Sequence, residues 1–366
     1  MIAGGWLLLL TAFALVTLLC RRLGAMPILC QLLLALALPL LSLTALQPAA
    51  LLQPGWVHWL YSLSFALVMG AILADIADSR LNLNSLKIAL PSFAVPFVCG
   101  LLCAGWLLTG SSATSRMAIG FLFALTAIPV LFLYLQSIRY PLQDMADLLQ
   151  AAILIDILCW GLFALAQPGP VWQMLLLPLS LGCLPLLLYG LKLRHEATLG
   201  VLFFVILAVL QVLGFNALLF GVSYALVMAR LGLRIRMPLP AAGWSRVQWY
   251  LCVPVLLACG ALQIDMGALD WQQASLWLPV FLLAPVLAKL VGNWLGLSWA
   301  WPHKSRSVRW QASVLLNIRG LTEVVFLNVL LAQGLIGSLL YFVFLLMSVT
   351  ATLLPAVLGI RLIKTR

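Results

Sequence analysis

The sequence predicts an all-α polytopic membrane protein, and two observations support this fold class. Hydrophobic residues make up 65% of the 366 residues and charged residues only 8%, and the mean hydropathy is +1.16. This composition leaves too little polar surface for a soluble domain. Apolar runs long enough to cross a bilayer, which takes about 20 residues of helix, also follow one another along the whole chain.

About thirteen such runs are separated by short polar loops. They fall at residues 2–20, 26–46, 55–75, 86–108, 116–136, 147–167, 170–190, 197–212, 215–231, 246–266, 272–297, 309–333 and 336–361. The division at 214–216 has an alternative, which is a single long tilted helix in place of two short ones. That helix would change the predicted direction of every helix before it.

Basic residues occupy alternate loops. They are Arg21, Arg22, Arg80, Lys87, Arg139, Lys192, Arg194, Arg230, Arg234, Arg236, Arg246, Lys304, Arg306, Arg309, Arg361, Lys364 and Arg366. Because cytoplasmic loops are enriched in Lys and Arg, the alternation predicts an N-terminus outside and a C-terminus inside. The net charge of +11 therefore indicates orientation in a membrane and no nucleic-acid partner. The arginines between 230 and 246 are also suited to hold anionic lipid.

A short internal echo suggests two related halves. The motif GAILAD ends the third run at Asp75, and GALQID ends the tenth run at Asp265. The two runs have opposite predicted directions, which favours inverted-topology repeats, although the more ordinary role of each Asp is to end a helix at the water interface. We expect one transmembrane domain over 1–366, with an extra helix at 1–25, repeats at 26–167 and 213–366, linking helices at 168–212 and no soluble regulatory domain.

Two predicted helices are interrupted at their centres. The first contains TAIPV, where Pro129 removes a backbone hydrogen bond and exposes carbonyl groups. The second contains NIRGL, from Asn317 to Leu321, where an Arg and a Gly interrupt an apolar run. Helices broken at equivalent positions of two inverted halves can present their ends to an ion. A plain proline kink is the alternative for the first.

Four full charges lie deep in the predicted spans: Asp156, Lys289, Arg319 and Glu323. A carboxylate at the centre of a membrane helix costs about 2.5–3.5 kcal/mol and is found where it faces a polar cavity or a partner. We therefore predict Asp156 as an ion or proton site, the alternative being a hydrogen bond that pins two helices together. Arg319 and Glu323 are one turn apart and can pair, which leaves Asp156 as the expected partner of Lys289. The eight cysteines lie in apolar segments without a CxxC pair and are predicted to be buried free thiols.

These segments resemble the membrane domain of the bacterial monovalent cation:proton antiporter-2 family, in the sodium/proton exchanger superfamily. The similarity covers nearly the whole chain and is most specific at RGLTEVVFLN, which starts at Arg319 and resembles the second crossing helix. TAIPV resembles the first crossing helix, AAILIDILCW the two-aspartate helix, AKLVG the lysine helix, LGFNALLFG the short paired spans and RRLGAMPILCQLL the second span. The resemblance implies two crossing discontinuous helices, a core domain that moves against a dimerisation domain, a homodimer, Asp156 as the ion-binding acid and Lys289 as its competing cation.

The sequence differs from the family at Ile155, which replaces the first of two adjacent acids. We expect a secondary antiporter, not an enzyme, that exchanges protons for Na⁺, K⁺ or Li⁺ at Asp156 without a cofactor, in a bacterial cytoplasmic (inner) membrane. Backbone carbonyls near Thr126, Ala127 and Pro129 would complete the cation shell. The alternatives are a transport-inactive membrane partner, favoured by Ile155, and a transporter of a small organic anion, favoured by Lys289 and Arg319. Exchange would be electroneutral, unless Lys289 also releases a proton.

Overall fold

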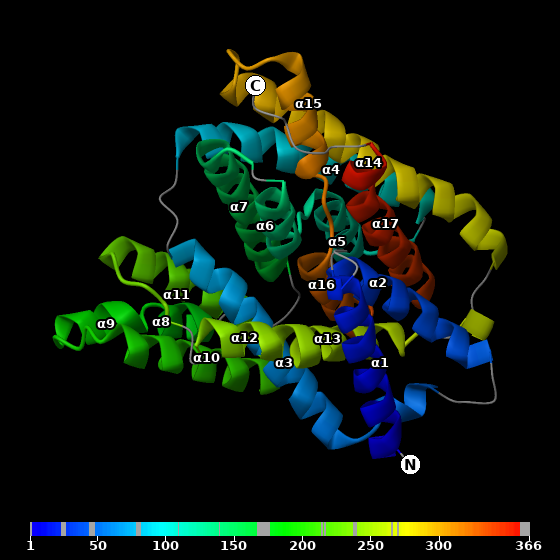
Figure 1. The fold of residues 1–366 in the computed structure, drawn as a ribbon, viewed down its shortest axis with the longest axis horizontal. Helices are drawn as coiled ribbons and strands as arrows, with labels where there is room; N and C mark the ends of the chain where they lie inside the picture. Colours follow the sequence, from blue (N-terminus) through cyan, green and yellow to red (C-terminus); the bar gives the residue numbers. More distant parts are fainter. Residues whose placement is uncertain are drawn as a thin grey trace. The chain divides into compact units, whose positions relative to one another are not determined.

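A computed structural model gives the arrangement of the helices (Figure 1). It describes residues 2–22, 27–43, 48–77, 82–108, 110–138, 140–166, 176–213, 215, 217–236, 240–264, 266–268 and 271–358. Every regular element among these residues is helical. Five helices of the described part are long and apolar enough to cross a membrane, at Ile2–Cys20, Leu83–Leu107, Leu142–Phe163, Trp277–Ala300 and Ser338–Pro355. The chain is a multi-pass helical membrane protein.

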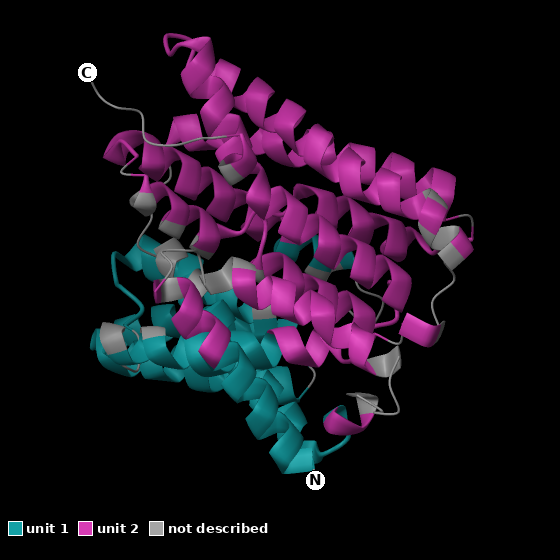
Figure 2. Ribbon diagram, turned by 45° about the vertical axis from the view of Figure 1, so that its right-hand side comes forward, with its two compact units in different colours: residues 1–14, 52–80, 160–256 teal, residues 15–51, 81–159, 257–366 magenta. Residues whose placement is uncertain are grey.

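The chain divides into two compact units, each built from separate stretches of sequence (Figure 2). Unit 1 comprises residues 1–14, 52–80 and 160–256, and unit 2 comprises residues 15–51, 81–159 and 257–366. The predicted repeats, 26–167 and 213–366, are continuous ranges of sequence. They are not the same as these two units, so the units do not test them.

Unit 1 contains α3 (Gly55–Ala77) and a group of helices from the central part of the sequence. The group is α8 (Leu177–Gly182), α9 (Leu184–Gly190), α10 (Glu196–Val212), α11 (Ala217–Leu231) and α12 (Ala241–Val247) with a π-helical turn at Gln248–Cys252. Helices α10 and α11 are separate, as predicted, although Gly214 and Asn216 lie outside the described residues. A cluster of aromatic rings around Phe203 and Tyr224 joins them, and the Tyr224 hydroxyl donates to the Leu199 carbonyl at 2.8 Å.

Unit 2 contains the longest helices. It holds α2 (Pro27–Ala37), α4 (Leu83–Leu107), α5 (Ala113–Ala124), α6 (Ile128–Ser137), α14 (Trp271–Ala300), α15 (Arg306–Leu315), α16 (Leu321–Ala332) and α17 (Ser338–Val357). The grouping divides α1 (Ile2–Arg22), α7 (Leu142–Ala166) and α13 (Val253–Ala261) between the units. The predicted run 26–46 ends its α-helix at Ala37 and continues as a 3-10 helix, Leu38–Leu43.

The backbone of α14 approaches the backbone of α4 closely at two glycines of α14. An added Cβ at Gly292 would lie 2.6 Å from the Pro91 carbonyl oxygen, and one at Gly296 would lie 2.5 Å from the Ile88 carbonyl oxygen. The motif GNWLG thus brings two helix backbones together, as small residues four apart do in membrane proteins. This contact holds the two helices that carry Ser92 and Lys289 in register.

Loops predicted to share one membrane face meet in the structure. In unit 2, Lys304 pairs with Asp144, while Asp147 accepts hydrogen bonds from Asn82 and Trp301, each at 3.1 Å. In unit 1, Arg236 pairs with Glu196 at 2.9 Å. These contacts agree with the predicted alternation of the loops, but which face is inside stays a prediction.

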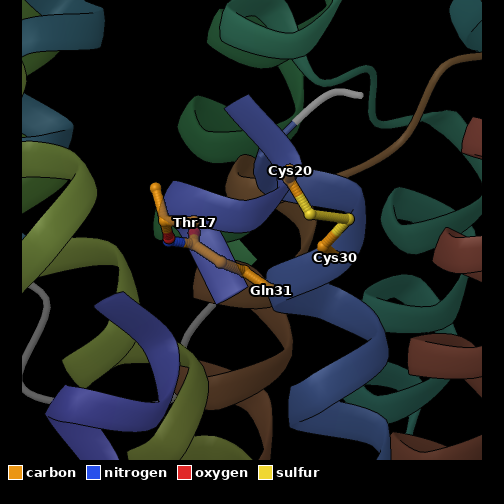
Figure 3. The surroundings of a disulfide bond; sticks show 4 residues. All are labelled: Thr17, Cys20, Cys30 and Gln31. Carbon is orange, nitrogen blue, oxygen red and sulfur yellow. A yellow bond between two sulfur atoms is a disulfide. The ribbon is translucent and has the colours of Figure 1, made fainter. Parts of the chain in front are cut away.

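One prediction about the cysteines is wrong. Cys20 at the end of α1 and Cys30 in α2 form a disulfide (Figure 3), Cys183 is exposed, and Cys99 and Cys103 are partly exposed. Beside the disulfide, the Gln31 side chain donates to the Thr17 hydroxyl at 2.7 Å. The ten-residue separation allows the chain to turn back and bring the two thiols together, which spacing rules for CxxC pairs do not detect.

Candidate functional site

The first interrupted helix is a pair of half-helices. Helix α5 ends at Ala124, residues 125–127 have no regular secondary structure, and α6 begins at Ile128. Pro129 is therefore the second residue of α6 and not a kink within a continuous helix. Proline is favoured in a first turn, where its missing N–H has no helical acceptor to lose. The side chain of Pro129 lies outside the described residues.

The second interrupted helix has the same construction. Helix α15 ends at Leu315, the backbone leaves the helix through Asn317 to Gly320, and α16 begins at Leu321. The predicted interruption at NIRGL is therefore present.

The two interruptions touch each other. The Ala127 amide donates to the Ile318 carbonyl at 3.1 Å, and the Thr322 hydroxyl donates to the Thr126 carbonyl at 3.2 Å. Glycine at position 320 allows this close approach, because an added Cβ would lie 2.8 Å from Cγ2 of Val130 and 3.3 Å from Cβ of Ala127. The four half-helices thus meet at one buried point of unit 2, which we call the crossing.

Two buried cations cap the end of α5 at the crossing. Lys289, with an exposed fraction of 0%, donates to the Ala124 carbonyl and, at 3.2 Å, to the Ser92 carbonyl. Arg319, equally buried, donates to the Leu122 carbonyl and, at 2.6 Å, to the Phe123 carbonyl. The last carbonyls of a helix have no partner within it and carry a partial negative charge. Both cations therefore compensate the broken helix.

Glu323 completes the charge balance on the α16 side. It pairs with Arg319 at 3.2 Å, as predicted from their spacing, and accepts a hydrogen bond from the Ser348 hydroxyl. Thr352 donates to the Arg319 carbonyl at 2.6 Å. This network ties α17 to the start of α16.

Asp156 differs from the other three charges. Its side chain is 3% exposed, and neither carboxylate oxygen has a hydrogen-bond partner. The ammonium of Lys289 and the backbone amide of Thr126 are near enough to act on its charge, but the expected direct pairing of Lys289 with Asp156 is not formed. Lys289 instead donates to a carbonyl at the end of α5. Asp156 is a buried acid with two unused oxygens beside the crossing.

The other predicted ligands are only partly free. The Thr126 carbonyl accepts from Thr322, and the Ala127 carbonyl accepts from the Leu131 amide at 2.9 Å. The Thr126 hydroxyl makes only a long contact of 3.5 Å with the Leu316 carbonyl. Thr126 thus offers an oxygen that can turn toward a bound ion.

A buried polar seam between α14 and α15 was not predicted. Asn293 donates to the Ser313 carbonyl at 2.9 Å, and the Ser313 hydroxyl donates to the Leu290 carbonyl at 2.9 Å. The side-chain oxygens of Asn293 and Asn317, and the hydroxyl of Ser92, are buried without a partner. Amides inside predicted spans are the signal that could have identified this seam.

Broken helices, a buried charge network and a buried acid within one membrane-embedded unit are features that secondary transporters use for ion sites.

Comparison with known proteins agrees at the level of the fold. No protein-family model matches the chain, and no curated protein matches its sequence. Among solved structures, the sodium proton antiporter from Methanocaldococcus jannaschii at pH 8 is similar, with a TM-score of 0.59 and 14% sequence identity. The match covers 98% of this chain and 95% of that chain. The two proteins share a fold over nearly their whole lengths.

Proposed function

We propose that this protein is a secondary antiporter that exchanges protons for a monovalent cation, Na⁺, K⁺ or Li⁺, at Asp156. The observation that carries the proposal is that neither oxygen of this buried carboxylate has a partner in hydrogen-bond geometry, although the Lys289 ammonium and the Thr126 amide are close enough to act on its charge. A buried polar group in such a state is costly unless a ligand or proton satisfies it. The shared fold with a sodium proton antiporter supports the same function.

Coupling follows from using one carboxylate for two ligands. The carboxylate takes up either a proton or a cation, so the two compete for it and cross the membrane in opposite directions. Asp156 and the Thr126 hydroxyl would supply protein oxygens to the cation, and water would supply the rest. The neighbouring residue is the apolar Ile155, so Asp156 has no second acid next to it in α7, which favours one proton per cation.

The finer features of the proposal come from the sequence. We place the protein in a bacterial inner membrane with its N-terminus outside, its halves related as inverted repeats, and two copies forming a dimer. Unit 2, which holds the crossing, would be the part that moves during transport.

The two alternative functions have weaker support. Transport of an organic anion would need a free buried cation, but Lys289 and Arg319 are both engaged by helix carbonyls. A transport-inactive partner would not need an acid kept without a partner beside two broken helices. Both alternatives make different predictions for the same experiment.

The test is cation-dependent proton movement in proteoliposomes that contain the purified protein. We expect Na⁺, K⁺ or Li⁺ to dissipate an imposed proton gradient, and Asp156→Asn to abolish this flux because an amide cannot titrate. The variant should still fold, because asparagine has nearly the size of aspartate and neither carboxylate oxygen of Asp156 has a partner in hydrogen-bond geometry.

Asp144→Asn is the matched control, because it removes an acid from the end of the same helix and should retain the flux. Full exchange by Asp156→Asn would refute the site. A wild-type protein that responds to no cation would favour the inactive partner, and a response to organic anions alone would favour the anion transporter.

A further inference from the structure

A groove on α14 and α15 is lined by none of the residues that form the crossing. It has a volume of about 380 Å³, and its apolar wall includes Leu287, Val291 and Leu295, which are 59%, 53% and 49% exposed. Their spacing of four residues aligns them along one face of α14. The wall is therefore a continuous apolar strip that ends beside the start of α15.

The end of the strip is aromatic and cationic. Trp294 and Trp310 meet edge to face, with ring centroids 6.3 Å apart. The guanidinium groups of Arg306 and Arg309 lie 5.8 Å and 5.4 Å from the Trp294 ring centroid. No ion pair with a described carboxylate satisfies either arginine, whereas nearby Lys304 is paired with Asp144.

One donor at this end is unused. The Nε atom of Arg309 is shielded from solvent and has no hydrogen-bond partner. The first turn of α15 also carries no acid. A negatively charged group is thus the missing complement of this end of the groove.

We propose that this groove binds an anionic phospholipid, with an acyl chain along Leu287, Val291 and Leu295 and the phosphate at Arg306 and Arg309. Tryptophans at the boundary between the apolar strip and the arginines match the level at which they occur in membranes. A free phosphate would use the arginines but not the strip. A second copy docked by the same patch would bring the arginines of both copies together without an acid.

The test is lipid-dependent thermal stabilisation of the purified full chain in detergent, with bound lipid counted by native mass spectrometry. Phosphatidylglycerol should raise the unfolding temperature more than phosphatidylcholine with the same chains, and inorganic phosphate should have little effect. Arg306→Gln with Arg309→Gln should weaken the apparent affinity for phosphatidylglycerol about 30-fold, from the attraction that two basic residues add for anionic lipid.

The second variant fills the groove without changing its charge. Val291→Trp should reduce phosphatidylglycerol binding while both arginines remain, and it decides the question if the arginine variant fails to fold. The charge-matched control is Lys192→Gln with Arg194→Gln, which removes two exposed basic residues from unit 1 and should leave most of the stabilisation.

Three results would overturn the proposal. An equal loss in the control would show a general effect of charge, and full stabilisation by inorganic phosphate would show a free-anion site. A change of oligomeric state in Val291→Trp, without loss of bound lipid, would make the groove a contact between two copies.

Discussion

Lys289 makes two kinds of contribution at the crossing. Its ammonium bonds to the carbonyls of Ser92 and Ala124, and its charge also acts on Asp156. The first contribution is structural, because it satisfies the end of α5, which continues into a segment without regular secondary structure instead of another turn. The second would influence which ligand Asp156 holds.

Replacing Lys289 should therefore cost stability. Lys289→Met keeps a long side chain but leaves two buried carbonyls without their donor, so we expect the free energy of unfolding to fall by about 1–3 kcal/mol. The measurement is the thermal unfolding temperature in detergent. Lys87→Met, at a partly exposed lysine of α4, is the control and should change little. Equal stability of the two variants would mean that the carbonyl contacts do not matter.

Arg319 and Glu323 should behave as one unit. Removing one member of a buried ion pair leaves an uncompensated charge and costs about 3–5 kcal/mol, so Arg319→Met and Glu323→Gln should each destabilise strongly. The double variant should recover part of the loss, with a coupling of about 0.5–3 kcal/mol in a double-mutant cycle. Additive losses would show that the 3.2 Å contact contributes no energy of its own.

At the scale of the helix, the positions of the two helix breaks could be predicted from the sequence, but the side chains that bind the broken helix ends could not. Pro129, Arg319 and Gly320 interrupt apolar runs, so the positions of both breaks could be predicted from the sequence. The partner of Lys289 could not, because a sequence shows side-chain charges but not the helix end that the fold brings beside them. The same reason explains why the Cys20–Cys30 disulfide was missed.

The contact between α4 and α14 gives a test of helix packing. Gly296→Ala places a methyl group 2.5 Å from a backbone oxygen that cannot move alone, so we expect a loss of about 1–3 kcal/mol from overpacking. Gly105→Ala in α4 is the control, because nothing lies within 4 Å of an added Cβ there. Thermal unfolding of both variants checks this, and an equally stable Gly296→Ala would contradict the close approach of the two backbones.

At the scale of the molecule, the chain forms its two units from interleaved segments. Unit 1 takes residues 1–14, 52–80 and 160–256, and no composition change in the sequence marks these boundaries. Hydropathy predicts the helices because each one is apolar by itself. It does not predict their grouping, which depends on contacts between distant helices such as α4 and α14.

The central claim for the whole molecule is that a proton and a cation share one carboxylate. Its most direct test is proton release by the purified protein in weakly buffered detergent when NaCl, KCl or LiCl is added, with choline chloride as the control. We predict about one proton released per bound cation, as competition at a single acid requires, and none from Asp156→Asn. Release of two protons would make Lys289 a second proton carrier, and cation binding without proton release, or unchanged release by Asp156→Asn, would contradict the claim.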